Sequence, residues 1–211
     1  MTKVKICGLN DEAGIDAAVG AGADYIGFSF FAASPRFVTP TRAAGLAARH
    51  VGGPRRVGLF VNPSEDDIAA VLDAVDLDIL QLYTDAMRAA ALRARFGRPV
   101  WRAVGVAVAA DLPGDGGGAD ALLIESKPPP GANRPGGNAT RFDWNLLAGW
   151  AAPLPWLLAG GLTPDNVAAA IHATAAPAVD VSSGVEISRG VKDVGLIRAF
   201  IAAARGASGV G

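Results

Sequence analysis

The chain has 211 residues, of which 51% are hydrophobic and 18% charged, and its formal net charge is −1 at pH 7. This length predicts a single domain with a substantial core, and the nearly neutral charge, without a run of lysines or arginines, argues against a nucleic-acid partner. Because Cys7 is the only cysteine and there are two histidines, an internal disulfide framework is excluded and a Cys/His metal site is not expected.

Eight strand-like segments alternate with helix-like segments along the chain. The strands are short apolar runs of the kind that parallel sheets bury on both faces, predicted at residues 4–7, 25–30, 56–61, 79–82, 100–104, 121–125, 156–159 and 179–181. Capping residues, or a proline at the first position, mark helices at about residues 11–21, 39–48, 64–75, 85–96, from 143, 163–171 and 194–205.

The segment after the fifth strand breaks this pattern. Residues 111–118 read DLPGDGGG, which cannot hold a long helix, so the fifth helix is expected to be degenerate. Eight β/α units in about 210 residues predict an α/β protein, a compact eightfold (β/α) barrel of the TIM type. We expect one barrel domain over residues 1–205 and a frayed tail at 206–211.

The N-terminal residues lead directly into the first strand and lack the apolar segment of a signal peptide. No apolar run approaches the ~20 residues that a membrane helix needs. We therefore expect a cytoplasmic protein without a membrane partner.

Chemistry in such a barrel takes place at the carboxyl ends of the strands. The polar side chains predicted there are Cys7, Arg36, Asn62, Gln81, Tyr83, Arg102, Glu125 and Asp180. If Cys7 points inward, strand parity predicts that Lys5 and Arg102 do so too. A buried lysine is costly without a partner, so an acidic neighbour of Lys5 is implied.

Glycine-rich turns follow the seventh and eighth strands. Gly160 and Gly161 end one strand, and Ser182, Ser183 and Gly184 follow the other. Backbone amides in such turns bind phosphate at these two positions of a barrel, although either turn alone is equally consistent with a simple tight turn. Together they favour a phosphosugar ligand, with Arg36 as a candidate for a second anionic group or, more commonly for an arginine, a surface residue.

Residue chemistry alone leaves the roles of Cys7 and Glu125 open. A thiol with a lowered pKa can act as a base, and a carboxyl in an apolar barrel mouth can stay protonated and act as an acid. The simpler interpretations are a small buried apolar residue for Cys7 and an ion pair with Lys127 for Glu125. On these grounds alone catalysis is not favoured for either residue.

Seven motifs, in chain order, resemble the phosphoribosylanthranilate isomerase family of tryptophan biosynthesis. They are KICGL (5–9), GFSFFAASPRFV (27–38), VGLFVN (57–62), KPPPGANRPGG (127–137), FDW (142–144), LAGGLTPDNV (158–167) and VDVSSGVE (179–186). The resemblance covers essentially the whole chain. It implies an eightfold barrel isomerase that needs no cofactor or metal and acts on a small phosphosugar substrate. Whether the chain is a monomer or a homodimer stays open.

The resemblance also implies a reaction and residue roles. The reaction is the Amadori rearrangement of N-(5′-phosphoribosyl)anthranilate to 1-(2-carboxyphenylamino)-1-deoxyribulose 5-phosphate. A carboxylic acid protonates the ribose ring oxygen, the ring opens to an imine, and a cysteine thiolate removes the C2′ proton. Cys7 matches the base, Arg36 the group that binds the anthranilate carboxylate, and the two glycine turns the phosphate site. Asp180 lies beside the site in the family pattern.

Two positions depart from that pattern. The family's acid is typically an aspartate, where this chain has Glu125, and strand four usually ends in Gln-Leu-His-Gly, where this chain has Tyr83 and Thr84 after Gln81-Leu82. Two alternatives follow: a related aminoaldose-phosphate isomerase with a shifted or broadened substrate, and a barrel that binds a sugar phosphate without turnover.

Overall fold

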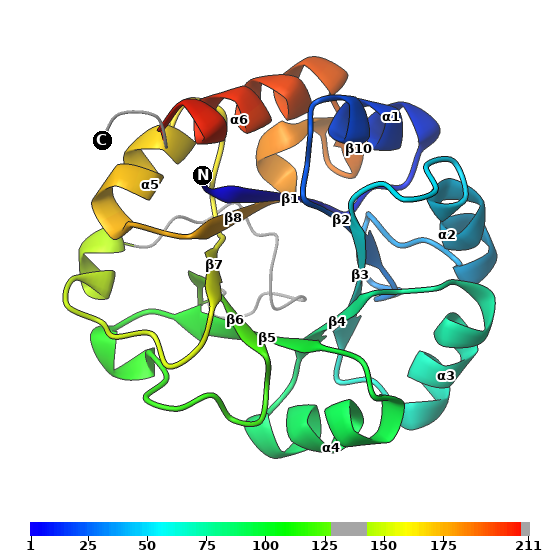
Figure 1. The fold of residues 1–211 in the computed structure, drawn as a ribbon, viewed down its shortest axis with the longest axis horizontal. Helices are drawn as coiled ribbons and strands as arrows, with labels where there is room; N and C mark the ends of the chain where they lie inside the picture. Colours follow the sequence, from blue (N-terminus) through cyan, green and yellow to red (C-terminus); the bar gives the residue numbers. More distant parts are fainter. Residues whose placement is uncertain (128–142, 208–211) are drawn as a thin grey trace.

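The computed structural model describes residues 1–127 and 143–207, and eight parallel strands close into a barrel in chain order (Figure 1). The strands are β1 (Lys3–Cys7), β2 (Tyr25–Ser29), β3 (Arg55–Val61), β4 (Ile79–Tyr83), β5 (Val100–Val106), β6 (Ala121–Ser126), β7 (Trp156–Leu158) and β8 (Ala178–Val181). The predicted eightfold barrel is therefore confirmed.

In the described part of the chain, six α-helices surround the strands (Figure 1). They are α1 (Glu12–Gly20), α2 (Pro40–Ala47), α3 (Glu65–Ala74), α4 (Ala86–Phe96), α5 (Val167–Thr174) and α6 (Val194–Gly206). Polar residues cap five of them by accepting a hydrogen bond from the first turn: Asp11, Thr39, Ser64, Asp85 and Asp193. None of the described helices is long and apolar enough to cross a membrane.

Two β/α units lack an α-helix in the described residues. After β5 the chain forms only the 3₁₀ turn η1 (Ala109–Asp111), as the sequence predicted for a degenerate fifth helix. The helix expected from Asp143 is wrong, because Asp143 caps only the 3₁₀ turn η2 (Trp144–Leu147). Gly149, with φ +74°, and Pro153 prevent the turn from continuing as a helix.

Smaller differences affect the last two helices. Helix α5 starts at Val167 instead of Thr163, because the Asn166 side chain binds the Thr163 amide and the Gly161 carbonyl and holds this segment as a turn. Helix α6 includes Gly206, which was expected in the tail. Residues 208–211 of the predicted tail, and most of the KPPPGANRPGG motif, lie outside the described residues.

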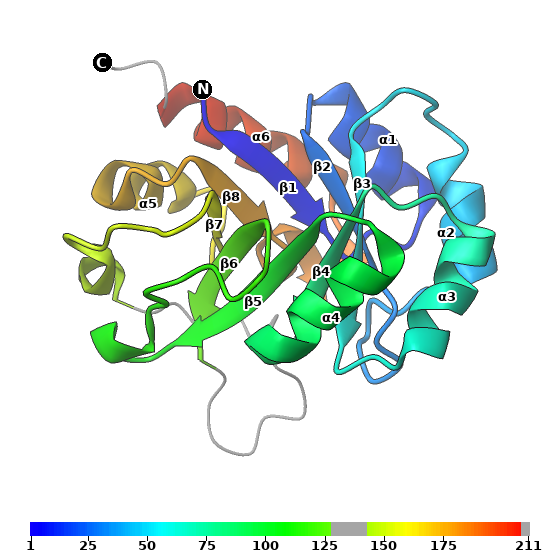
Figure 2. The same cartoon turned by 60° about the horizontal axis from the view of Figure 1, so that its bottom comes forward.

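The barrel interior changes in character along its axis. Near the N-terminal ends of the strands it is filled by an apolar cluster from seven strands: Tyr25, Val57, Ile79, Trp101, Ala121, Leu157 and Ala178. At the opposite end, toward which the strand arrows point in Figure 2, the strands carry buried polar side chains: Lys5, Gln81, Glu125 and Asp180. A second, larger core fills the space between the strands and the helices. Packing therefore stabilises one end and leaves the other for polar groups.

Candidate active site

Lys5 and Asp180 form a buried ion pair inside the barrel. They lie opposite each other on the adjacent strands β1 and β8, and Lys5 Nζ donates to Asp180 Oδ1 at 2.8 Å. Burial disfavours the charged ammonium, but the neighbouring Asp180 and Cys7 outweigh it, so the pKa of Lys5 lies above its ordinary value. The acidic partner predicted for a buried lysine is thus confirmed.

Cys7 lies two residues further along β1 and is almost fully buried. Its neighbour on β2 is Gly27, where a Cβ would lie 3.0 Å from Cys7 Sγ and 3.2 Å from Lys5 Cε. Burial raises the pKa of the Cys7 thiol, and the positive charges of Lys5 and Lys192 oppose that shift only in part. The sulfur is therefore a protonated thiol at neutral pH, held next to two cations that favour its thiolate form.

Glu125 projects from β6 on the far side of the barrel from β1 (Figure 1) and is 5% exposed. Burial raises the pKa of its carboxyl to about 8, although the nearby Tyr83 hydroxyl opposes the shift. The carboxyl is therefore protonated at neutral pH. An ion pair of Glu125 with Lys127 is not present, because Lys127 Nζ lies 3.8 Å from Asp111 Oδ1 instead.

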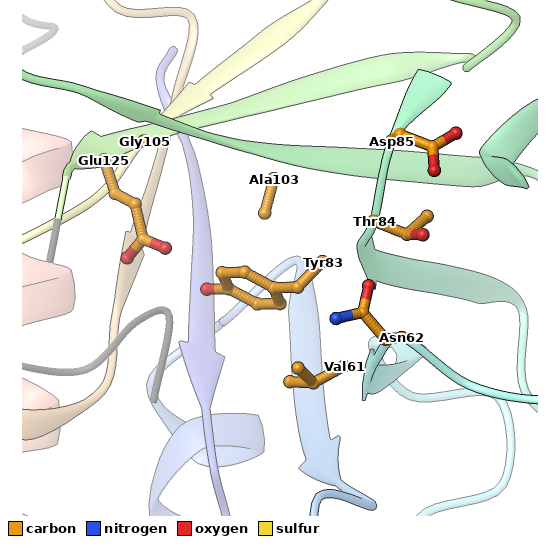
Figure 3. A pocket seen from close by; sticks show the side chains of 8 residues that line it. All are labelled: Val61, Asn62, Tyr83, Thr84, Asp85, Ala103, Gly105 and Glu125. Atoms are coloured by element: carbon orange, nitrogen blue, oxygen red, sulfur yellow. The ribbon is translucent and has the colours of Figure 1, made fainter. Parts of the chain in front are cut away.

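A pocket of about 300 Å³ opens beside this carboxyl (Figure 3). Tyr83 extends across it with its hydroxyl directed toward Glu125. Burial and the nearby Glu125 raise the pKa of the Tyr83 phenol well above its ordinary value, so the phenol remains a hydrogen-bond donor. The lining residues are Val61, Asn62, Tyr83, Thr84, Asp85, Ala103, Gly105 and Glu125.

Arg36 is buried and is not the surface residue that arginines usually are. Its Nε and Nη2 donate to the two carboxylate oxygens of Glu186 at 2.6 and 2.9 Å, and Lys192 Nζ lies 2.9 Å from Glu186 Oε1. Burial would raise the pKa of Glu186, but Arg36 and Lys192 lower it to about 2. Burial in turn lowers the pKa of Lys192, and the neighbouring Glu186 carboxylate opposes that shift.

The local sequence around Arg36 follows from this packing. Gly8, with φ +72°, lies directly under the arginine, and a Cβ there would come within 2.6 Å of Arg36 Cδ. Glu186 starts the short strand β9 (Glu186–Ser188), which pairs with β10 (Val191–Lys192). Glu186 and Lys192 were not predicted as site residues from the sequence. Glu186 ends the VDVSSGVE motif, whereas no sequence pattern marks Lys192.

The two predicted phosphate turns lie against each other. Gly160 and Gly161 have φ of +84° and +65°, and a Cβ at Gly184 would overlap the Leu162 carbonyl oxygen. Ser182 precedes the 3₁₀ turn η3 (Ser183–Val185), and its carbonyl accepts from Lys192 Nζ at 2.8 Å. The turns after β7 and β8 therefore form one surface, with a lysine behind it.

Of Arg102 and Gln81, which were both predicted at the barrel mouth, only Gln81 faces the interior. The inward orientation of Arg102 is wrong, because β5 directs Trp101, its neighbour in the chain, into the barrel and Arg102 outward, toward Gly117. Gln81 does face the interior and is fully buried, and neither amide atom has a hydrogen-bond partner among the described residues. No group of three or more His, Cys, Asp or Glu side chains in the described residues is arranged to hold a metal ion.

An eightfold parallel barrel whose carboxyl end holds a buried thiol, a protonated carboxyl and a fixed arginine has the architecture of a TIM-barrel enzyme with acid–base chemistry. Residues 4–203 match the family model described as N-(5′-phosphoribosyl)anthranilate (PRA) isomerase. The chain belongs to this family.

Individual relatives agree with the family match. N-(5′-phosphoribosyl)anthranilate isomerase from Acidiphilium cryptum is 60% identical, over 98% of this chain and 100% of that protein. The crystal structure of TrpF from Jonesia denitrificans has 37% identity and a TM-score of 0.85, over 99% of both chains. A phosphoribosyl anthranilate isomerase crystallised with reduced 1-(o-carboxyphenylamino)-1-deoxyribulose 5-phosphate has 30% identity and a TM-score of 0.81, over 98% of this chain and 100% of that one.

Proposed function

We propose that this chain catalyses the Amadori rearrangement of N-(5′-phosphoribosyl)anthranilate to 1-(2-carboxyphenylamino)-1-deoxyribulose 5-phosphate, a step of tryptophan biosynthesis. The observation that carries the proposal is the placement of a protonated carboxyl, Glu125, and a buried thiol, Cys7, in one barrel mouth beside a held arginine. The family membership and the names of the relatives give the same activity.

Glu125 is the general acid of the first step. Its proton goes to the ribose ring oxygen as the bond between that oxygen and C1′ breaks, and the amine lone pair forms the C1′=N double bond. The products are an open-chain protonated imine and the Glu125 carboxylate. A carboxyl with a pKa of about 8 carries the proton at neutral pH, which an exposed glutamate does not.

Cys7 is the general base of the second step. Its thiolate takes the proton from C2′, the released pair forms C1′=C2′, and the π electrons of C=N return to nitrogen to give the enolamine. The enolamine then loses its O2′ proton and gains one at C1′, which yields the ketone. Lys5 and Lys192 beside the sulfur favour the thiolate, and the cationic imine acidifies C2′, so a small thiolate fraction is sufficient.

The remaining site residues bind the two ends of the substrate. Arg36 uses Nε and Nη2 for Glu186, so among the described contacts Nη1 is the guanidinium nitrogen left for the anthranilate carboxylate. The backbone amides of the two turns bind the phosphate, with positive charge from Lys192 behind them. Gln81, Tyr83 and Asp180 line the space between the two ends.

All of these groups come from one copy of the chain, which is consistent with a monomer or with a homodimer that has independent sites. We place the enzyme in the cytoplasm. A shifted substrate is the second candidate function, and the observation that favours it is the replacement of the family's aspartate and histidine by Glu125 and Tyr83 at the mouth.

The test is turnover by the purified chain. Loss of phosphoribosylanthranilate fluorescence, with mass-spectrometric detection of the ketose product, is expected for the wild type and not for the Cys7→Ala variant. A parallel assay on a histidine-pathway aminoaldose phosphate measures substrate choice. Binding of a product analogue without fluorescence loss in the wild type would instead support a non-catalytic barrel, and faster turnover of the second substrate would support the shifted enzyme.

A further inference from the structure

The backbone around Glu125 gives its carboxyl little lateral support. At the same level the neighbouring strand β5 presents Gly105, and the segment after β7 presents Gly160. A Cβ at Gly160 would lie 3.3 Å from Glu125 Cβ and 2.9 Å from the Ser126 amide nitrogen. Glycine therefore allows the backbone to approach Glu125 on this side, but it provides no side chain that could fix the carboxyl.

Tyr83 supplies the missing side-chain contact from β4, which lies beyond β5. Strand β5 separates β4 from β6, and its inward residues at this level are Ala103 and Gly105, which are small enough for the phenol ring to reach across them (Figure 3). The ring passes Ala103, and its hydroxyl faces the Glu125 carboxyl.

The backbone of both residues is held in place. Tyr83 pairs with Val61 on β3, and its carbonyl accepts from the Asn62 amide at 3.0 Å. Glu125 pairs with Gly105 on β5. Tyr83 has only two side-chain torsions and Glu125 has three, so a hydrogen bond between them restricts the more mobile group.

We propose that Tyr83 is a positioning residue for Glu125: its phenol donates to the carboxyl and holds the acid at the mouth, so that positions 83 and 125 work as a pair. This inference rests on the proposed function only in the identity of the acid. In this role the Tyr83 hydroxyl contacts Glu125 and does not bind the substrate.

A double-mutant cycle tests the pairing. The Tyr83→Phe variant removes only the hydroxyl and is expected to lower kcat by about ten- to a hundred-fold, because the acid loses its orientation. The Glu125→Asp variant shortens the carboxyl by one methylene and withdraws it from the phenol. In that background Tyr83→Phe is expected to change kcat by less than about twofold. An equal loss in both backgrounds would overturn the proposal.

The pH profile separates positioning from simple packing. A hydrogen bond donated to the carboxylate lowers its pKa, so removal of the hydroxyl raises the pKa of Glu125 above about 8. The limb of the kcat/KM profile that reports Glu125 is then expected to move to higher pH in Tyr83→Phe. The matched control is Tyr25→Phe, which removes the hydroxyl of the chain's only other tyrosine, in the apolar cluster at the far end of the barrel. In Tyr25→Phe, both kcat and the pH limb that reports Glu125 should stay unchanged.

A direct titration gives an answer that does not depend on turnover. The chain has four glutamates, Glu12, Glu65, Glu125 and Glu186, so carbon-13 labelling of the glutamate carboxyls yields four signals, and Glu125→Gln assigns one of them. That signal is expected to titrate at higher pH in Tyr83→Phe than in the wild type. The same midpoint in both proteins would sink the inference, whereas absence of isomerase activity in the wild type would sink only the proposed function.

Discussion

The two ends of the barrel interior are built from the same strands and have opposite character. On β4 the inward residues run from Ile79 through Gln81 to Tyr83, and on β6 they run from Ala121 to Glu125. Over four residues along a strand, roughly 13 Å, the interior changes from an apolar layer to titratable groups. Stability and chemistry are therefore separated along the barrel axis, so substitutions at the two ends should have separable effects.

The largest effect is expected at the polar end. Glu125→Gln keeps the size of the side chain but removes the transferable proton, so kcat should fall by about 10²- to 10⁴-fold. Steady-state kinetics on phosphoribosylanthranilate measure this, and product-analogue binding should be retained. A variant with wild-type kcat would remove Glu125 from the role of acid.

The same substitution, which lowers activity, should make the free energy of unfolding less sensitive to rising pH. The pKa of Glu125 rises from 4.5 to about 8 on folding, so between these values the native state holds a proton that the unfolded state has released. Wild-type stability therefore falls with rising pH by up to about 1.4 kcal/mol per unit in this window, from this residue alone. Denaturant titrations at pH 5 and pH 8 should show a smaller fall for Glu125→Gln.

Lys5→Met tests the buried ion pair that supports the polar end. It leaves Asp180 buried without its cation, so the free energy of unfolding should drop by about 3–5 kcal/mol. Lys3→Met on the same strand is the matched control, because Lys3 is exposed and its loss should change stability by less than about 0.5 kcal/mol. Similar values for the two variants would contradict the central role of the pair.

Ile79→Ala probes the apolar end. Ile79 is fully buried, so the cavity should cost about 2–5 kcal/mol of unfolding free energy. Because Ile79 lies four residues before Tyr83 on β4, away from the barrel mouth, kcat at 25 °C should stay within about twofold of the wild type. A large fall in kcat with the fold intact would show that the two ends are coupled.

The smallest expected effect is seen in how kcat/KM of the wild type depends on pH. The base must be deprotonated and the acid protonated, yet the pKa of Cys7 is raised above its ordinary value and that of Glu125 lies near 8. The active form is therefore a minority species. The kcat/KM value should rise with pH to about 8, level off, and fall above the Cys7 pKa. A fall beginning well below pH 8 would contradict these assignments.

Much of this organisation could be predicted from the sequence because it is local. Apolar runs, capping residues and glycine turns predicted the eight strands and all six α-helices of the described residues, and the cost of a buried lysine predicted an acidic partner for Lys5. Parity failed at Arg102, because a run such as Val100–Val104 does not reveal whether Trp101 or Arg102 faces inward until the neighbouring strands fill the interior.

Contacts distant in sequence could not be predicted in the same way. Arg36 and Glu186 are 150 positions apart, and the fork between them depends on how the β9–β10 hairpin lies on the loop after β2. A Cβ at Gly190, in the hairpin turn, would lie 2.6 Å from the Pro35 carbonyl oxygen. The packing of this hairpin on the loop also places Lys192 at the site, and no local sequence pattern predicts such packing.

The most direct test of this mechanism is a measurement of proton removal by Cys7. With substrate deuterated at C2′, the wild type is expected to release one deuteron to solvent per turnover. The Cys7→Ala variant should bind a product analogue normally and release deuterium about 10²- to 10⁴-fold more slowly. Deuterium release at the wild-type rate from Cys7→Ala would contradict the assignment of Cys7 as the base at the polar end of the barrel.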